Sequence, residues 1–118
     1  MGLSKARLIA EIADEKKGEE ILLLEVRGLC NFTDFFVLVT AETRPLRNSI
    51  LHEVESRLRA GGERPFGAEG LESNQWAVMD FGDVVLHVFN REARDYYGLE
   101  RLWGDARQLA WQGAHPAA

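Results

Sequence analysis

Cysteine is almost missing from this sequence, with one residue, Cys30, among 118. An internal disulfide is therefore impossible, and a zinc site built on cysteine ligands is excluded. Long apolar runs are missing as well. Residues 1–17 mix charged and apolar side chains, unlike a signal peptide, and no run approaches the roughly 20 residues of a membrane span. We expect a cytoplasmic protein that does not contact membranes.

Basic residues are fewer than acidic ones. Lys and Arg total 14 against 19 Asp and Glu, which gives a formal net charge of −5. A broad phosphate-binding surface depends on clustered Lys and Arg, and the aromatic residues are not interleaved with basic ones. We therefore expect little or no direct nucleic-acid binding. A basic partner suits this balance better, because opposite potentials promote association.

Motifs for catalysis are missing too. The glycine-containing segments 61–62 and 67–70 have neither the spacing nor the lysine of a phosphate-binding loop. His87 has no serine, cysteine or acid at a spacing that indicates a triad. Asp80 and Asp83 flank a predicted turn, where aspartate is common for structural reasons, and two carboxylates make a poor metal site. The prediction is a non-enzymatic protein with no catalytic residue, metal or cofactor.

What the sequence does contain is a regular order of helix and strand patterns. Apolar residues at three- and four-residue spacing predict a first helix, which Ser4 can cap and Gly18 ends. Two runs, 21–26 and 35–40, predict strands. Both runs are apolar on both faces, which is typical of a sheet covered on both sides.

A second helix is predicted from Thr43, with Pro45 in its first turn, to the glycine pair that follows residue 60. A loop is predicted over 63–75, with a short strand near 64–66. The strands 76–81 and 84–89 follow as a hairpin with a tight Gly82-Asp83 turn, and two helices, 91–97 and 99–107, come after it. We expect residues 1–108 to form one α/β domain, a mixed sheet flanked by helices, and residues 109–118 to form a flexible tail.

The hairpin contains most of the candidate partner contacts. Strand alternation places Met79 and Phe81 on one face and Trp76 on the other. One face packs on the core, and the other is either covered by a helix or open to a partner. Exposed aromatic and methionine clusters mark interfaces, and acids there can pair with Arg or Lys of a partner. The candidate contacts are Trp76, Met79, Asp80, Phe81, Asp83 and Tyr97.

Three segments of the chain resemble the ribosomal silencing factor (Iojap-like) family. They are the hairpin with the residues that precede it (69–89, including Trp76 and the run DFGDVVLHVF), the C-terminal run LERLWGDA (99–106) and the strand entry FTDFFV (32–37). The segments occur in the family's order and spacing. The resemblance implies an α/β fold with nucleotidyltransferase-like topology but without the catalytic motifs of those enzymes.

The resemblance also implies a function. Such factors bind the large ribosomal subunit through its fourteenth protein, block joining of the small subunit and repress translation under nutrient limitation or in stationary phase. The acidic balance fits a basic ribosomal protein. One alternative is a large-subunit assembly factor or a homodimerisation module. Another is a magnesium-dependent nucleotidyltransferase that uses Asp80 and Asp83, although the chain lacks the Asp-x-Asp strand and Gly-Ser element of such enzymes.

Overall fold

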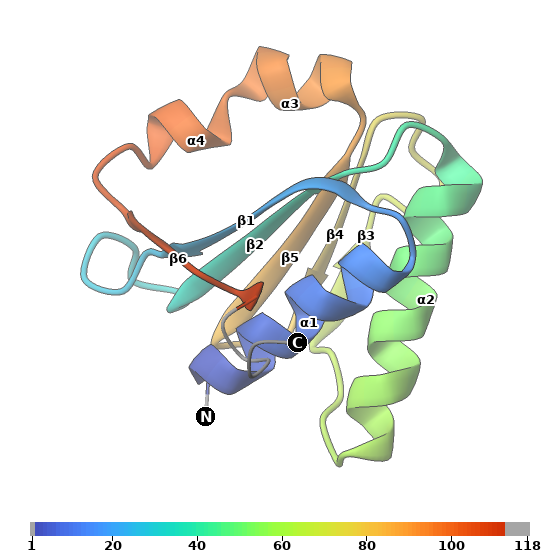
Figure 1. Ribbon diagram of the computed structural model, residues 1–118, viewed down its shortest axis with the longest axis horizontal. Helices are drawn as coiled ribbons and strands as arrows, with labels where there is room; N and C mark the ends of the chain where they lie inside the picture. Colours follow the sequence, from blue (N-terminus) through green and yellow to red (C-terminus); the bar gives the residue numbers. More distant parts are fainter. Residues whose placement is uncertain (1, 113–118) are drawn as a thin grey trace.

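The computed structural model describes residues 2–112 (Figure 1). Its elements follow one another in the order α1 (Gly2–Glu15), β1 (Glu19–Glu25), β2 (Phe35–Thr40), α2 (Arg44–Ala60), β3 (Gly67–Glu69), β4 (Trp76–Asp80), β5 (Val84–Phe89), α3 (Arg91–Tyr97), α4 (Leu99–Leu102) and β6 (Arg107–Leu109). The strands form one sheet in the order β3-β4-β5-β2-β1-β6. The predicted mixed sheet is confirmed: β2 and β5 are parallel, and the other neighbours are antiparallel.

The two central strands explain why their sequences are continuously apolar. Every residue of β2 and β5 is buried. α1 and α2 cover one face of the sheet, and α3 and α4 lie over the other (Figure 1). A parallel pair at the centre of a sheet is buried on both faces, so alternation of polar and apolar residues is lost there.

Helix α2 begins as predicted. The Thr43 hydroxyl oxygen accepts a hydrogen bond from the backbone N–H of Leu46 at 3.2 Å, which satisfies one of the donors left free at a helix start. The fully buried Arg47 next to it was not expected. Its guanidinium donates to the carbonyl oxygens of Ala41 and Glu42, at 2.9 and 3.1 Å, and so ties the helix to the end of β2.

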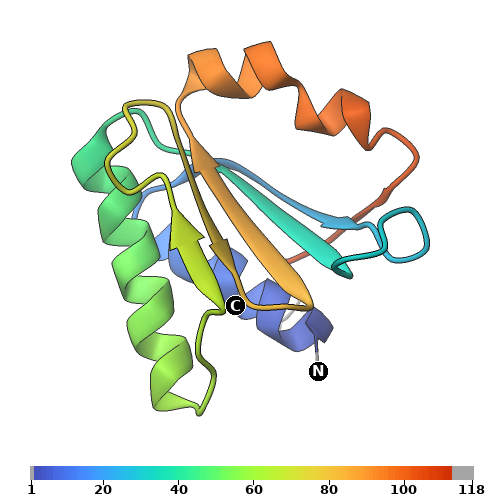
Figure 2. The same cartoon turned by 180° about the vertical axis from the view of Figure 1, so that it is seen from behind.

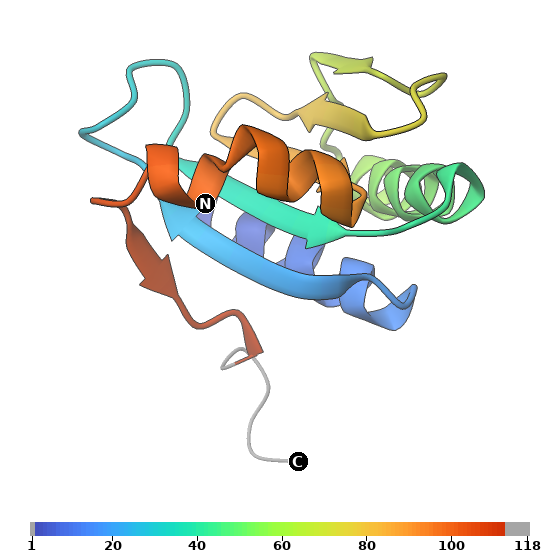
Figure 3. The ribbon, with the colours of Figure 1, turned by 90° about the horizontal axis from the view of Figure 1, so that it is seen from above.

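The helices cover the second face only in part. Viewed from above, α3 and α4 cross the β1–β2 side of the sheet, while β3 and β4 have no helix over them (Figure 3). α3 has seven residues and α4 four, so at about 1.5 Å per residue neither can span the sheet. The view from behind shows β3 at the sheet edge beside α2 (Figure 2). The β3–β4 side is therefore covered on one face and open on the other.

Three predicted boundaries are wrong. The first helix begins at Gly2, so Ser4 lies within its first turn and does not cap it. The short strand is β3, three residues after the expected 64–66, because its residues pair with β4 from Gly67 onward. The last predicted helix ends at Leu102, and a short edge strand follows it. Pairing between distant strands decides the latter two boundaries, and local periodicity does not report it.

The chain remains attached to the sheet beyond residue 108. Leu109 of β6 pairs with Leu23 of β1. The indole N–H of Trp111 donates to the carbonyl oxygen of Ile21 at 3.1 Å. Residues 109 and 111, expected to belong to a flexible tail at 109–118, are therefore packed against the sheet. Residues 113–118 of that expected tail lie outside the described residues. No helix within residues 2–112 is long and apolar enough to cross a membrane.

Candidate functional site

Strand β4 presents two different faces. Ala77 and Met79 point into the core between the sheet and the helices α1 and α2. Trp76, Val78 and Asp80 alternate with them, are half-buried and lie on the partly uncovered face. The predicted alternation is therefore confirmed, and the question of which face is open is settled by where the helices lie.

The structure places Met79 and Phe81, two of the candidate contacts, in the core and not on the partly uncovered face. Their side chains are 2% and 4% exposed and belong to the core cluster beneath α1 and α2. Both side chains face α1 and α2, on the opposite side of the sheet from Trp76 and Asp80. Both residues therefore belong to the core and do not lie on the partly uncovered face.

Trp76 and Tyr97 form an aromatic pair on the open face. Their ring centroids are 4.6 Å apart, within the range of a favourable aromatic contact, and Tyr97 is 48% exposed. Tyr97 is the last residue of α3, which begins where the side-chain oxygen of Asn90 accepts a hydrogen bond from the N–H of Ala93 at 2.8 Å. The helix ends at Gly98, whose left-handed backbone conformation (φ 57°) favours glycine. The structure thus brings together two of the predicted contacts from separate elements.

His87 of β5 lies beneath Trp76 and is 9% exposed. The indole N–H of Trp76 donates to Nδ1 of His87 at 3.2 Å. Burial lowers the pKa of His87 to about 4, so the imidazole is neutral near pH 7. Since Nδ1 accepts a hydrogen bond, the proton of the neutral ring is on Nε2. Nε2 is buried and has no hydrogen-bond partner in the described part of the chain.

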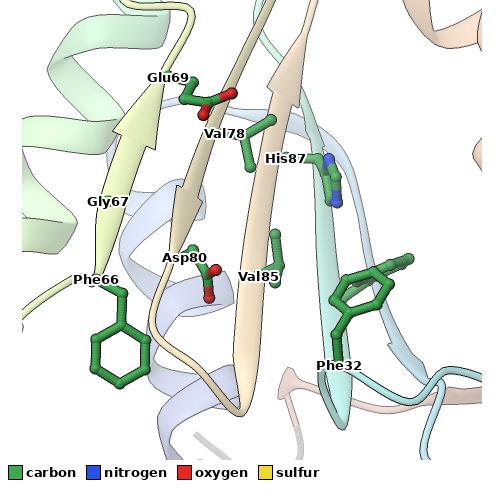
Figure 4. A pocket seen from close by; sticks show the side chains of 9 residues that line it. Phe32, Phe66, Gly67, Glu69, Val78, Asp80, Val85 and His87 are labelled. Atoms are coloured by element: carbon green, nitrogen blue, oxygen red, sulfur yellow. The ribbon is translucent and has the colours of Figure 1, made fainter.

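A pocket of about 430 Å³ opens on the same face beside His87 (Figure 4). Its walls include the exposed rings of Phe32 and Phe66, which are 65% and 81% exposed. The residues that line it are Phe32, Phe36, Phe66, Gly67, Glu69, Val78, Asp80, Val85 and His87. A second hollow of about 370 Å³ adjoins it, shares Glu69 and Val78 with it, and extends to Trp76 and Tyr97. The two hollows make one continuous surface, which we call the β4 surface.

The β4 surface is acidic as well as aromatic. Glu69 and Asp80 line the larger pocket, and neither hollow is lined by a lysine or arginine among the described residues. Asp80 also has a structural role, because its carboxylate accepts a hydrogen bond from the N–H of Gly82 at 2.7 Å in the hairpin turn. A positively charged group that approaches this surface meets two carboxylates, and no lysine or arginine of residues 2–112 lines it.

Asp83 does not belong to this surface. Its carboxylate pairs with Lys5 of α1 at 2.7 Å, and Lys5 also contacts Glu63 at 3.0 Å. The aspartate therefore connects the hairpin turn to α1, away from Trp76 and Tyr97. Within residues 2–112, no group of three or more histidine, cysteine, aspartate or glutamate side chains is arranged to hold a metal ion.

Phe32, Phe66 and His87 are the site residues that sequence reasoning did not identify. Phe32 and Phe66 lie in irregular segments without periodicity, so no local pattern indicates on which side of the sheet they project. Large apolar residues in polar loops are the one available signal. His87 was considered as a member of a catalytic triad, and in the structure its Nδ1 accepts a hydrogen bond from the indole N–H of Trp76.

Comparison with known families gives a consistent result. Residues 3–117 match the family described as ribosomal silencing factor during starvation. A ribosomal silencing factor of Halalkalibacterium halodurans is 35% identical over 107 residues, which are 91% of this chain and 92% of that protein. The chloroplastic protein Iojap of Zea mays is 38% identical over 110 residues, which are 91% of this chain and 46% of that longer protein.

Solved structures resemble the fold as a whole. A crystal structure of a protein from Chromobacterium violaceum superposes with a TM-score of 0.79 at 31% identity, covering 98% of this chain and 92% of that one. A crystal structure from Bacillus halodurans gives a TM-score of 0.75 at 32% identity, covering 87% of this chain and 93% of that one. The single α/β domain predicted from the sequence is thus shared with these proteins.

Proposed function

The chain belongs to the ribosomal silencing factor family, and from this premise we propose that it binds the large ribosomal subunit and prevents the small subunit from joining. The contact is made with the fourteenth protein of the large subunit. The consequence is repression of translation when nutrients are limiting. No chemical turnover is involved, because occupancy of the intersubunit face is sufficient.

The observation that supports this proposal best is the Trp76–Tyr97 pair, which lies where the end of α3 meets β4 at the border of the partly uncovered face. Tryptophan and tyrosine are, with arginine, the residues enriched among those that dominate binding energy at interfaces. The carboxylates of Glu69 and Asp80 lie on the same surface, and the whole chain has a net charge of −5. An aromatic, acidic surface suits a basic protein partner.

The size of the protein is adequate for a steric mechanism. The folded chain extends about 33 × 33 × 31 Å. A body of this size bound on the intersubunit face separates two surfaces that must come within hydrogen-bond distance to associate. The factor must then only bind free large subunits tightly enough to compete with the small subunit. A dissociation constant of about 1 µM corresponds to about −8 kcal/mol, and each further 1.4 kcal/mol tightens binding about tenfold.

Co-sedimentation with purified large ribosomal subunits tests the proposal. We expect the wild type to pellet with the subunit and to reduce the joining of added small subunits in a sucrose gradient. Trp76→Ala and Tyr97→Ala should both weaken pelleting by tenfold or more. Leu8→Ala, which truncates an exposed side chain on α1 at the other face of the sheet, serves as the control and should pellet like the wild type.

Two results would contradict the proposal. A wild-type protein that stays in the supernatant has no affinity for the subunit. A protein that pellets without reducing subunit joining binds at a place that does not occlude the small subunit. The identity of the contact is checked separately with the purified fourteenth protein, whose failure to bind the wild type would exclude it as the partner.

A further inference from the structure

An unpaired donor lies beside the larger pocket of the β4 surface. The neutral imidazole of His87 has its proton on Nε2, because Trp76 occupies Nδ1. Nε2 is buried and has no partner in the described residues. A buried N–H without a partner costs about 1–3 kcal/mol, so such groups are rare and call for an explanation. In Figure 4 the ring lines the pocket on the side of Phe32.

The walls of the pocket add two further requirements. Phe32 and Phe66 project at its two sides and are largely exposed. Exposure of their rings to water is unfavourable, and an apolar occupant that covers them would gain free energy of binding. Glu69 and Asp80 supply two negative charges without a cation from the chain among the lining residues. The occupant that fits must therefore have an acceptor for His87, an apolar part for the phenylalanine rings, and a positive charge for the carboxylates.

We infer that this pocket binds a segment of the partner polypeptide that carries an arginine or lysine next to an aliphatic residue. A backbone carbonyl of the segment accepts the hydrogen bond from Nε2 of His87, once the side chains that cover this buried atom move aside. The aliphatic side chain lies between Phe32 and Phe66, and the basic side chain pairs with Glu69 and Asp80. This inference rests on the proposed function for the identity of the partner, whereas the chemistry of the segment rests on the pocket alone.

A polypeptide segment accounts for the site better than a second copy of this chain. The pocket is continuous with the Trp76–Tyr97 hollow, so a partner that covers one extends naturally over the other. A second copy would bring another surplus of five negative charges to a surface that already presents two carboxylates. Such like-charge approach is unfavourable, whereas a basic partner is attracted.

The first test uses the whole chain and purified large ribosomal subunits. The double variant Asp80→Asn/Glu69→Gln removes both charges, and asparagine keeps the oxygen that accepts from Gly82. We expect about tenfold weaker binding and a smaller loss of affinity between low and high salt than in the wild type. The matched control is Asp14→Asn/Glu19→Gln, which removes two exposed charges outside the pocket and should leave both quantities unchanged.

The second test is independent of the ribosome. The ¹⁵N-labelled protein is titrated with N-acetyl-leucyl-argininamide and, separately, with the citrulline analogue, which has nearly the same shape without the charge. We expect saturable NMR shifts at the amides of Val78 and Val85 and at Nε2 of His87. The arginine peptide should bind at least fivefold more tightly than the citrulline peptide, and the double variant should bind both equally.

Each of two results would overturn the inference. One is equal ribosome affinity and equal salt dependence for the wild type and the double variant. The other is the absence of shifts at the pocket, or equal binding of the two peptides by the wild type. Failure of the proposed function is distinguishable, because the wild type would then not co-sediment while the arginine peptide still binds the pocket.

Discussion

The two faces of the sheet differ in cover more than in composition. On the α1–α2 face, the side chains of β4 and β5 are those of alanine, valine, leucine and methionine and are almost fully enclosed. On the other face the same strands present apolar residues as well, but α3 and α4 reach only part of the way across them. Trp76 and Met79 are three residues apart on one strand and have opposite roles for this reason. The extent of helix cover, and not hydrophobicity, separates the core from the candidate interface.

The largest expected difference between the faces comes from two phenylalanines near the same hairpin turn, Phe81 within the turn and Phe66 beside it. Phe81→Ala should lower the free energy of unfolding by about 3–5 kcal/mol, because Phe81 is 4% exposed in the core. Phe66→Ala should change it by no more than about 0.5 kcal/mol, because Phe66 is 81% exposed. Urea denaturation followed by circular dichroism measures both. Similar losses in the two variants would show that the faces do not differ in this way.

The second prediction concerns the pH dependence of the free energy of unfolding that arises from His87 on the partly uncovered face. Burial lowers its pKa from 6.5 to about 4, so between these values the unfolded chain binds a proton that the folded one does not. Stability from this group is therefore complete above pH 6.5 and is lost as the pH falls toward 4. Each tenfold difference in proton affinity is worth about 1.4 kcal/mol, so the loss is at most about 3 kcal/mol.

Urea denaturation at intervals from pH 7 to pH 4 measures this effect. Carboxylates of proteins generally titrate in part of the same range, so the quantity of interest is the difference between the wild type and His87→Gln. Glutamine can accept from Trp76 and carries no titratable group. The difference should shrink as the pH falls. A difference that stays constant with pH would mean that the imidazole is not held neutral by burial.

The third prediction tests how the short helix α3 is held over the sheet. Asn90→Ala removes the side-chain oxygen that accepts from the N–H of Ala93, and should lower the free energy of unfolding by about 1 kcal/mol. Asn90→Ser should keep most of the wild-type stability, because serine is also a favoured N-cap residue. Asn31→Ala, in an exposed loop, is the control. If serine does not restore stability, the cap is not the source of the effect.

The smallest stability effect is expected at Tyr97, one of the proposed partner contacts. Tyr97→Leu keeps an apolar side chain over Trp76, so the free energy of unfolding should change by no more than about 0.5 kcal/mol. Co-sedimentation with large ribosomal subunits should nevertheless weaken by about tenfold, because an anchoring ring is lost. A variant that unfolds easily but binds normally would reverse the roles assigned to the two faces.

The candidate site was predictable in outline from the hairpin alone. Alternation along β4 correctly separated Trp76 from Met79, and the Gly82-Asp83 turn correctly placed the strands. The face assigned to the partner could not be chosen, because it depends on the positions of helices that come from distant segments. Asp83 was grouped with Asp80 on proximity in sequence, whereas its ion pair with Lys5 directs it to α1.

By itself the sequence determined the order of the main elements, the mixed α/β sheet, the acidic balance and the resemblance to one family. These properties depend on local periodicity and composition, which can be read along the chain. Only the tertiary structure decided which side of β4 is open and where β6 pairs. It also showed that His87 has a buried N–H without a partner among residues 2–112, in a pocket that Glu69 and Asp80 line as well. These depend on contacts between residues far apart in sequence, which form when helices of limited length pack on a sheet wider than they can cover.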